Sequence, residues 1–150
     1  MAKDAVRPAA WLFKEEPGHY SFADLERDGL TLWEGVTNAL ARQHLRQVLP
    51  GDRVLYYHTG KERAIVGDAR ITEGARPDPK SDDPKAVVVG VEPVRPWAVP
   101  LTLERIKKDP QLKTWDLVRL PRLSVVPIST EQLARLEELA ASLPSAKAVS

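Results

Sequence analysis

Residues 10–18 read AWLFKEEPG, and this stretch decides what kind of fold the chain forms. Its first half, Ala10–Lys14, is a short apolar run rich in aromatic side chains, which is typical of a strand. Pro17 and Gly18 end the run, because proline restricts the backbone and glycine permits turn conformations. The stretch therefore predicts an N-terminal strand followed by a turn.

Similar apolar runs predict strands further along the chain. The run at 86–91, AVVVGV, is β-branched and continuously apolar, which favours a central strand. Pro93 and Pro96 should end this strand or place it at a sheet edge. The other predicted strands are Arg53–His58, Ile65–Ile71 and Arg122–Ile128.

Capping residues predict the helices. Ser21 followed by Asp24 is typical of a helix N-terminus, and Ser129 with Gln132 forms a capping-box pattern. The predicted helices are Phe22–Asp28, Asn38–Val48, Leu103–Lys108 and a last helix after Ser129, with Leu133, Leu136, Ala140 and Leu143 inward. The elements together predict an α+β fold: a mixed sheet or small barrel of about five to six strands, flanked by short helices.

The composition of the 150 residues excludes several classes of protein. The chain has no cysteine, which excludes disulfides, thiol catalysis, iron–sulfur clusters and thiolate zinc sites. Its 22 Lys and Arg against 21 Asp and Glu give a net charge of +1, so it is not a basic protein that coats nucleic acid. Thirteen prolines argue against a helix bundle, and four of the nine aromatic residues are tryptophan.

We expect one domain over residues 10–143, between a flexible leader at 1–9 and a flexible tail at 144–150. No apolar run approaches the roughly 20 residues that cross a membrane, so no membrane partner is expected. A cytoplasmic location fits the absence of a secretory signal, with nucleoid association in a bacterium or a nuclear location in a eukaryote.

The sequence contains none of the motifs for nucleotide-phosphate binding, zinc proteolysis or serine hydrolysis. Its three histidines, His19, His44 and His58, lie in three different predicted elements, with spacings that do not support a metal site. His44 is expected to be solvated on the polar side of its helix. We therefore predict no metal and no cofactor.

Trp33 is the most informative aromatic residue, in the segment LTLWEGVTN. Next to Gly35 and Asn38, it could present a flat ring to a planar ligand, with Asn38 reading the ligand's edge. Alternatively, Trp33 is a core residue, Gly35 a turn residue and Asn38 a helix cap. Trp11, Trp97 and Trp115 are expected to serve packing.

Charge is locally uneven despite the near-neutral total. Residues 105–122 contain six basic and two acidic residues, an excess of +4. Such a patch suits contacts to phosphates, although charged clusters are usually only a solvated surface.

Six segments in order resemble one known family, the EVE domain, which is PUA-like and similar to the YTH and ASCH domains. They are WLFKEEPGHYSFADL, LWEGVTNALARQHLR, GDRVLYYHTG, IVGDARI, PDPK and LVRLPRLSVVPI, spread over roughly residues 10–138. The resemblance implies a PUA-like mixed β-barrel flanked by helices. It also implies a non-enzymatic reader of a modified base, chiefly 5-methylcytosine or 5-hydroxymethylcytosine in DNA, with the base flipped into an aromatic-lined pocket.

Carried over by motif, the resemblance implies a set of base-binding residues. They are Lys14, Glu16, Trp33, Gly35, Val36, Asn38, Tyr57, His58, Arg122, Leu123 and Ser124. The candidates for phosphate contacts are Lys14, Arg42, Arg46 and Arg122. Two positions depart from the family pattern: Glu15 replaces a serine in KEEP, and Thr37 replaces an arginine in GVTN.

Two alternative functions remain open at the level of sequence. One is binding of modified RNA instead of DNA. The other is a PUA-like hydrolase that acts on nucleic acid, in which Lys14, Glu16, Tyr57 and His58 would form an acid–base site. In preference to both alternatives, we expect a monomeric reader of DNA with no catalytic residues.

Overall fold

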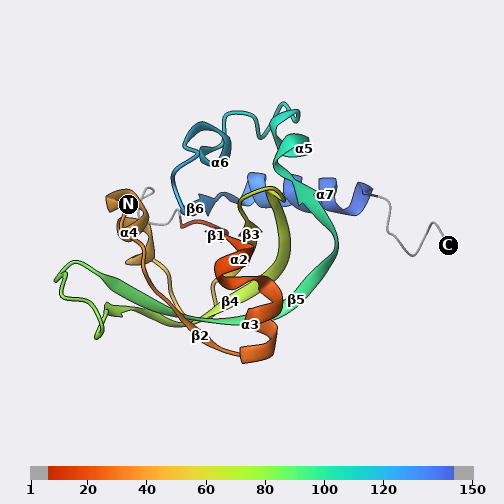
Figure 1. Cartoon of the computed structure of the whole chain (residues 1–150). Coiled ribbons are helices and arrows are strands. Elements are labelled where there is room, and N and C mark those ends of the chain that lie inside the picture. Colours follow the sequence, from red (N-terminus) through yellow and green to blue (C-terminus); the bar gives the residue numbers. More distant parts are fainter. Residues whose placement is uncertain (1–6, 144–150) are drawn as a thin grey trace.

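Six strands form one mixed sheet in the computed structural model, which describes residues 7–143 (Figure 1). The strands are β1 (Ala10–Glu15), β2 (Thr31–Trp33), β3 (Arg53–His58), β4 (Ala64–Pro77), β5 (Val87–Thr102) and β6 (Val125–Ile128). Their order in the sheet is β2-β5-β4-β3-β1-β6, with β1 parallel to β3 and the other neighbours antiparallel. The predicted α+β fold and strand number are confirmed.

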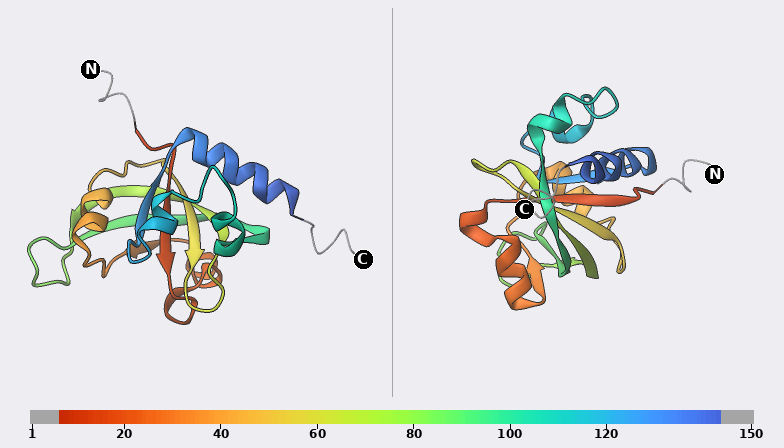
Figure 2. Two further views of the ribbon diagram at one scale, coloured as in Figure 1. Left: turned by 90° about the horizontal axis from the view of Figure 1, so that it is seen from above. Right: turned by 90° about the vertical axis from the view of Figure 1, so that its right-hand side faces the viewer.

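The sheet is strongly curved but open. Figures 1 and 2 show the long strands β4 and β5 bending around β1 and β3. Within residues 7–143, no strand pairing joins the outermost strands β2 and β6. The structure is thus a mixed sheet curved like a barrel and not a closed one.

The aromatic run of β1 lies at the centre of the core. Trp11, Leu12 and Phe13 have no exposed surface, because β1 pairs with β3 on one side and β6 on the other. On β3, Val54 to Tyr56 are equally buried. A strand with both faces covered requires apolar side chains in succession, which explains the unbroken run in the sequence.

Strand β5 is much longer than the predicted segment 86–91. It continues through Pro93 and Pro96 to Thr102 and pairs with β4 across several register shifts. Beyond Val91, where the pairing with β2 ends, β4 is its only strand neighbour within the described residues. The prolines therefore lie in an edge strand, as one of the two predicted alternatives requires.

Six helices flank the sheet in the described residues: α2 (Pro17–Tyr20), α3 (Phe22–Asp28), α4 (Ala39–Leu45), α5 (Leu103–Lys107), α6 (Asp116–Arg119) and α7 (Thr130–Ser142). The capping boxes of α3 and α7 form as predicted, with Ser21 and Ser129 as N-caps. Several details differ from the sequence prediction, and the short strand β2 was not predicted. Helix α4 is shorter, α6 and α2 were not predicted, and β6 begins only at Val125, so Arg122–Ser124 lie in a loop.

Three tryptophans serve packing and structural hydrogen bonds, as predicted. The indole N–H of Trp11 donates to Asp52, that of Trp97 to Asp68, and that of Trp115 to the carbonyl of Pro127. Each bond links segments that are distant in sequence.

The predicted leader at 1–9 and tail at 144–150 fall mostly or wholly outside the described residues. No helix in residues 7–143 is long and apolar enough to span a membrane.

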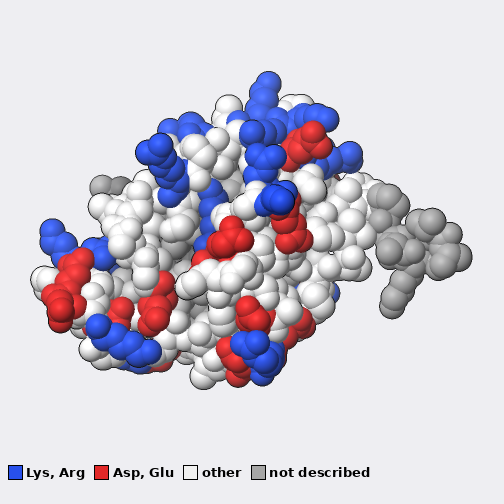
Figure 3. Space-filling model, in the orientation of Figure 1, with Lys and Arg blue, Asp and Glu red and all other residues white. Residues whose placement is uncertain are grey.

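Charges are distributed unevenly over the face shown in Figure 3. Lys and Arg gather in the upper part, over α5 and α6. Asp and Glu are concentrated in the lower part, over α3 and the loop between β4 and β5, where some basic residues are interspersed.

Candidate functional site

A pocket of about 340 Å³ lies between the N-terminus of α4 and the loop that joins α6 to β6. Its lining residues are Asn38, Leu40, Arg119, Leu120, Pro121, Arg122 and Leu123. The sequence predicted Asn38, Arg122 and Leu123 as site residues. It missed the other four, although Arg119, Leu120 and Pro121 stand directly before Arg122 in the motif LVRLPRLS. We call this cavity the α4–α6 pocket.

Asn38 and Leu40 form one side of this pocket, and the segment 35–37 leads up to it. The side-chain oxygen of Asn38 accepts a hydrogen bond from the Ala41 amide at 2.9 Å, so Asn38 is the N-cap of α4 and its NH₂ group stays available. Gly35 has a φ of +79°, which disfavours any residue with a Cβ, and a Cβ there would meet no atom within 4 Å. The open space at Gly35 permits close approach of a ligand to the backbone.

Lys14 holds the opposite wall in place. Its ammonium group donates to the Pro121 carbonyl at 2.9 Å, and its backbone amide donates to the Ser124 carbonyl at 2.9 Å. The ammonium also lies 5.9 Å from the centre of the Tyr57 ring. Burial lowers the pKa of Lys14. Lys14 thus fastens the loop 121–124 to β1.

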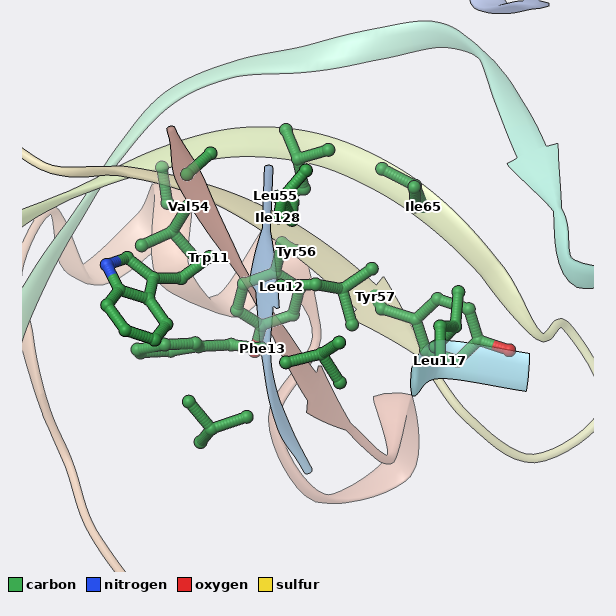
Figure 4. Packing of buried hydrophobic residues seen from close by; sticks show 14 of the residues in the cluster. Trp11, Leu12, Phe13, Val54, Leu55, Tyr56, Tyr57, Ile65, Leu117 and Ile128 are labelled. Carbon is green, nitrogen blue, oxygen red and sulfur yellow. The ribbon is translucent and has the colours of Figure 1, made fainter. Parts of the chain in front are cut away.

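Tyr57 lies on the same face of the sheet as Lys14, because the two residues pair across β1 and β3. Figure 4 shows its side chain directed toward α6, where Leu117 lies. Only 3% of its surface is exposed, and burial raises the pKa of its hydroxyl to about 12. Tyr57 therefore stays a neutral phenol at physiological pH.

Trp33 lies on the other face of the sheet. Its ring packs against Phe13, at 5.3 Å between ring centres, and edge-on against Tyr56, at 5.5 Å. Phe13 and Tyr56 each precede a residue of the Lys14–Tyr57 pair, and successive strand residues point to opposite faces. With 4% of its surface exposed, Trp33 occupies the place that the core interpretation predicts.

The indole N–H of Trp33 distinguishes it from the other tryptophans. It is the one indole of the four that donates no hydrogen bond within residues 7–143. Stacking of a ligand on the ring face stays a prediction, and it would require core residues to move.

The remaining predicted residues of the set stabilise local structure. Leu123 is buried, and Val36 is 9% exposed. The Val36 carbonyl accepts a hydrogen bond from Arg42 at 2.7 Å. Glu16 caps α2 by accepting from the Gly18 amide. His58 is 8% exposed, and its Nε2 accepts from the Phe22 amide at 3.0 Å, while its Nδ1 lies 2.7 Å from Glu62.

The four side chains of the hydrolase hypothesis are only loosely grouped in residues 7–143, where Lys14 lies 5.9 Å from the centre of the Tyr57 ring. No hydrogen bond there joins any two of the four side chains Lys14, Glu16, Tyr57 and His58. Both ring nitrogens of His58 are engaged elsewhere. Lys14, Glu16 and His58 instead make local hydrogen bonds with Pro121, Gly18 and Phe22.

The predicted phosphate contacts divide into two groups. Arg42 is largely buried and pairs with Asp83 at 2.9 Å, and Arg46 donates to the Lys85 carbonyl at 2.8 Å. Both arginines therefore fasten the loop between β4 and β5 to α4. Arg122 is exposed, and its side chain has no ion pair within residues 7–143. Of the three arginines, Arg122 is the best placed to contact a phosphate.

The two departures from the family pattern lie at the surface. Glu15 contacts His19 at 3.2 Å and accepts a hydrogen bond from the Glu16 amide. Thr37 is exposed.

The histidines form no metal site in the described part of the chain, where no group of three or more potential ligands occurs. The prediction that His44 is solvated is wrong. Its ring lies 6.0 Å from that of Trp11, and both ring nitrogens are buried without a hydrogen-bond partner. The helix turns this residue toward β1, because α4 packs closely against the sheet.

Acidification is expected to destabilise the protein through His44. Burial lowers the pKa of His44, with a smaller opposing effect of Asp116, so the unfolded chain binds more protons than the folded one below about pH 6.5. This destabilisation by His44 is absent at higher pH and grows as the pH falls from about 6.5 toward the pKa of His44 in the folded state. Thermal denaturation between pH 7.5 and 5 measures it. In His44→Leu, the melting temperature should fall less over this range; an equal fall would contradict the assignment.

The chain is similar in sequence to known proteins over nearly its whole described length. The sequence profile of the EVE domain matches residues 9–139. Thymocyte nuclear protein 1 of Mus musculus is 31% identical over 169 residues, which cover 90% of this chain and 75% of that protein.

Solved structures agree with this match. Rpa0253 of Rhodopseudomonas palustris has a TM-score of 0.83 at 34% identity, covering 91% of this chain and 95% of that one. Human THYN1, solved in complex with DNA containing 5-methylcytosine, has a TM-score of 0.82 at 30% identity, covering 90% and 99%. On the extent of the profile match and the agreement in fold, the chain belongs to the EVE domain family.

Proposed function

We propose that this protein is a non-enzymatic reader of modified cytosine in DNA. The observation that carries the proposal is the likeness to human THYN1, whose structure was solved with DNA containing 5-methylcytosine. The likeness spans 90% of this chain at a TM-score of 0.82, and the EVE profile match over residues 9–139 includes every residue that lines the α4–α6 pocket.

We propose that the α4–α6 pocket receives the flipped base. Its walls supply a leucine- and proline-lined surface from Leu40, Leu120 and Pro121, and a polar edge from Asn38. The free NH₂ group of Asn38 can donate to the base, since its oxygen is already used in capping α4. Arg122 stands at the rim, where it can meet the phosphate of the flipped nucleotide.

The aromatic wall expected from the sequence is not part of this pocket's lining. Trp33 stands five positions before Asn38, and its indole N–H, which donates no hydrogen bond within residues 7–143, could donate to a base that approaches along the Gly35 backbone. We therefore propose an edge contact for Trp33, since stacking on its ring would require Phe13 or Tyr56 to move.

The expected difference in affinity between modified and unmodified cytosine is modest. Burying the 5-methyl group against apolar side chains contributes about 0.8 kcal/mol, which corresponds to roughly a fourfold difference in affinity. Flipping costs a few kcal/mol for modified and unmodified cytosine alike, and edge contacts and phosphate contacts must compensate it.

Removing the Asn38 NH₂ group is expected to weaken binding of the flipped base, whether or not the cytosine is modified. Asn38→Ser keeps an N-cap oxygen, because serine caps helices about as well as asparagine, but it lacks the NH₂ group. Fluorescence anisotropy would measure affinity for otherwise identical duplexes with cytosine, 5-methylcytosine or 5-hydroxymethylcytosine. Wild type should prefer a modified duplex, and the variant should bind all three duplexes more weakly by about 1 kcal/mol, roughly fivefold, with the ratio between them kept.

Two controls make the result decisive. A thermal melt of Asn38→Ser should match wild type, which shows that α4 remains capped. A single-stranded RNA carrying 5-methylcytosine tests the RNA alternative in the same assay. Equal wild-type affinity for all duplexes would overturn the proposal. Monomeric state and cellular location stay predictions.

A further inference from the structure

Six exposed cations lie on one continuous stretch of chain that leads from α5 through α6 to the α4–α6 pocket. We call residues 105–122 the basic segment. Its cations are Arg105, Lys107, Lys108, Lys113, Arg119 and Arg122. Figure 3 shows Lys and Arg gathered over the same two helices.

The two acidic residues of the basic segment are neutralised internally. Asp109 is 5% exposed and accepts hydrogen bonds from Arg135 of α7 at 2.8 and 2.6 Å. This pairing with Arg135 lowers the pKa of Asp109, which keeps it ionised. Asp116 pairs with Arg119 at 2.6 Å. The other five cations have no ion pair within residues 7–143, so their charge is free to act on a partner.

The basic segment is anchored to the core by buried side chains that alternate with its cations. Ile106, Leu112, Trp115 and Leu117 are at most 4% exposed, so buried side chains recur between the cations. The indole of Trp115 donates to the Pro127 carbonyl on β6 at 3.0 Å. The cations are therefore presented in a fixed arrangement, and binding costs little backbone ordering.

The basic segment ends at the pocket. Arg119 and Arg122 belong to both, since each lines the α4–α6 pocket. Many of the acidic groups on this face lie away from the pocket, over α3 and the loop between β4 and β5, and a few lie beside the cations over α5. A polyanion drawn to the cations thus meets the pocket at one end of its path.

We propose that the basic segment is the surface that binds the phosphate backbone of duplex DNA. This inference rests on the proposed function and assigns the two energetic roles to separate places. The basic segment supplies affinity that is independent of the base, and the α4–α6 pocket supplies recognition of the base. The assignment also replaces Arg42 and Arg46, whose side chains are used within the chain.

The test compares two double substitutions with equal change in charge. Lys107→Gln with Lys108→Gln alters the basic segment. Lys80→Gln with Lys85→Gln alters exposed lysines of the loop between β4 and β5 and serves as the control. Affinity for duplexes with and without 5-methylcytosine is measured from 50 to 200 mM salt.

The expected result follows from counterion release. Each lost phosphate contact reduces the slope of log affinity against log salt by about 0.9, so the slope should fall by about 1.8 in the first variant. Over a fourfold range of salt, wild type should therefore lose about 12-fold more affinity than the variant. The ratio between modified and unmodified duplexes should stay unchanged, and the control should behave like wild type.

An unchanged slope in the first variant, or an equal change in the control, would overturn the inference. Equal wild-type affinity for modified and unmodified duplexes, together with the expected fall in slope, would overturn the proposed function but support the phosphate surface. Failure of wild type to bind any duplex would overturn both.

Discussion

Replacing Trp33 with alanine is expected to lower the free energy of unfolding by about 3–5 kcal/mol. The ring is 4% exposed and fills the space between Phe13 and Tyr56, so its removal leaves a cavity among aromatic side chains that cannot easily collapse. Urea denaturation measures the change. Leu32→Ala on the same strand is the matched control, because Leu32 is 37% exposed and its truncation should cost far less.

This result decides how binding data on Trp33 should be understood. Loss of DNA binding in Trp33→Ala would follow from unfolding alone, whatever the ring contacts. Trp33→Phe separates the two roles, since it keeps much of the packing but lacks the indole N–H. A Trp33→Ala variant with wild-type stability and lost discrimination would contradict the core role.

Gly67→Ala is expected to destabilise the protein by about 1–3 kcal/mol. A Cβ at this buried strand position would lie 2.7–2.8 Å from three carbons of the Phe22 ring, which sits directly on the glycine. The ring cannot withdraw freely, because it packs edge-on against Tyr56 at 5.5 Å and the Phe22 amide donates to His58. The substitution should therefore displace the start of α3 from β4.

Thermal and urea denaturation test this expectation against a control on the same strand. Gly74 is also in β4, but a Cβ there would meet its nearest atom, the Val48 carbonyl oxygen, at an ordinary 3.5 Å. Gly74→Ala should be neutral or slightly stabilising, since alanine restricts the unfolded chain. Equal stability of the two variants would show that Phe22 does not confine Gly67.

Local signals predicted the helix ends well. Ser21 with Asp24, and Ser129 with Gln132, form both hydrogen bonds of a capping box, because such bonds need only residues three apart. The length of β5 depends instead on pairing with β4, whose partner residues lie about 10 to 38 positions away. Strand β2 has only three residues, too few for a periodic pattern.

The site was predicted only in part, because its local motifs are visible in the sequence but its long-range contacts are not. The motif around Asn38 and Arg122 led to the α4–α6 pocket, although the sequence alone could not tell whether Trp33 faced a ligand or the core. That choice depends on Phe13 and Tyr56, which come from two other strands. Likewise, Arg42 looks free in sequence, but its partner Asp83 comes from a loop 41 positions later.

The prolines of β5 bear on how this protein behaves when crowded with copies of itself. An edge strand with an unbroken row of N–H groups is a template on which another chain can add a strand and begin to aggregate. Pro93, Pro96 and Pro100 interrupt that row in the part of β5 that has only β4 beside it. Replacing them with β-branched residues would keep the pairing with β4 but would give β5 an exposed edge to which another chain could add a strand. The prolines thus protect against aggregation along the part of β5 that, within the described residues, has a neighbouring strand on one side only.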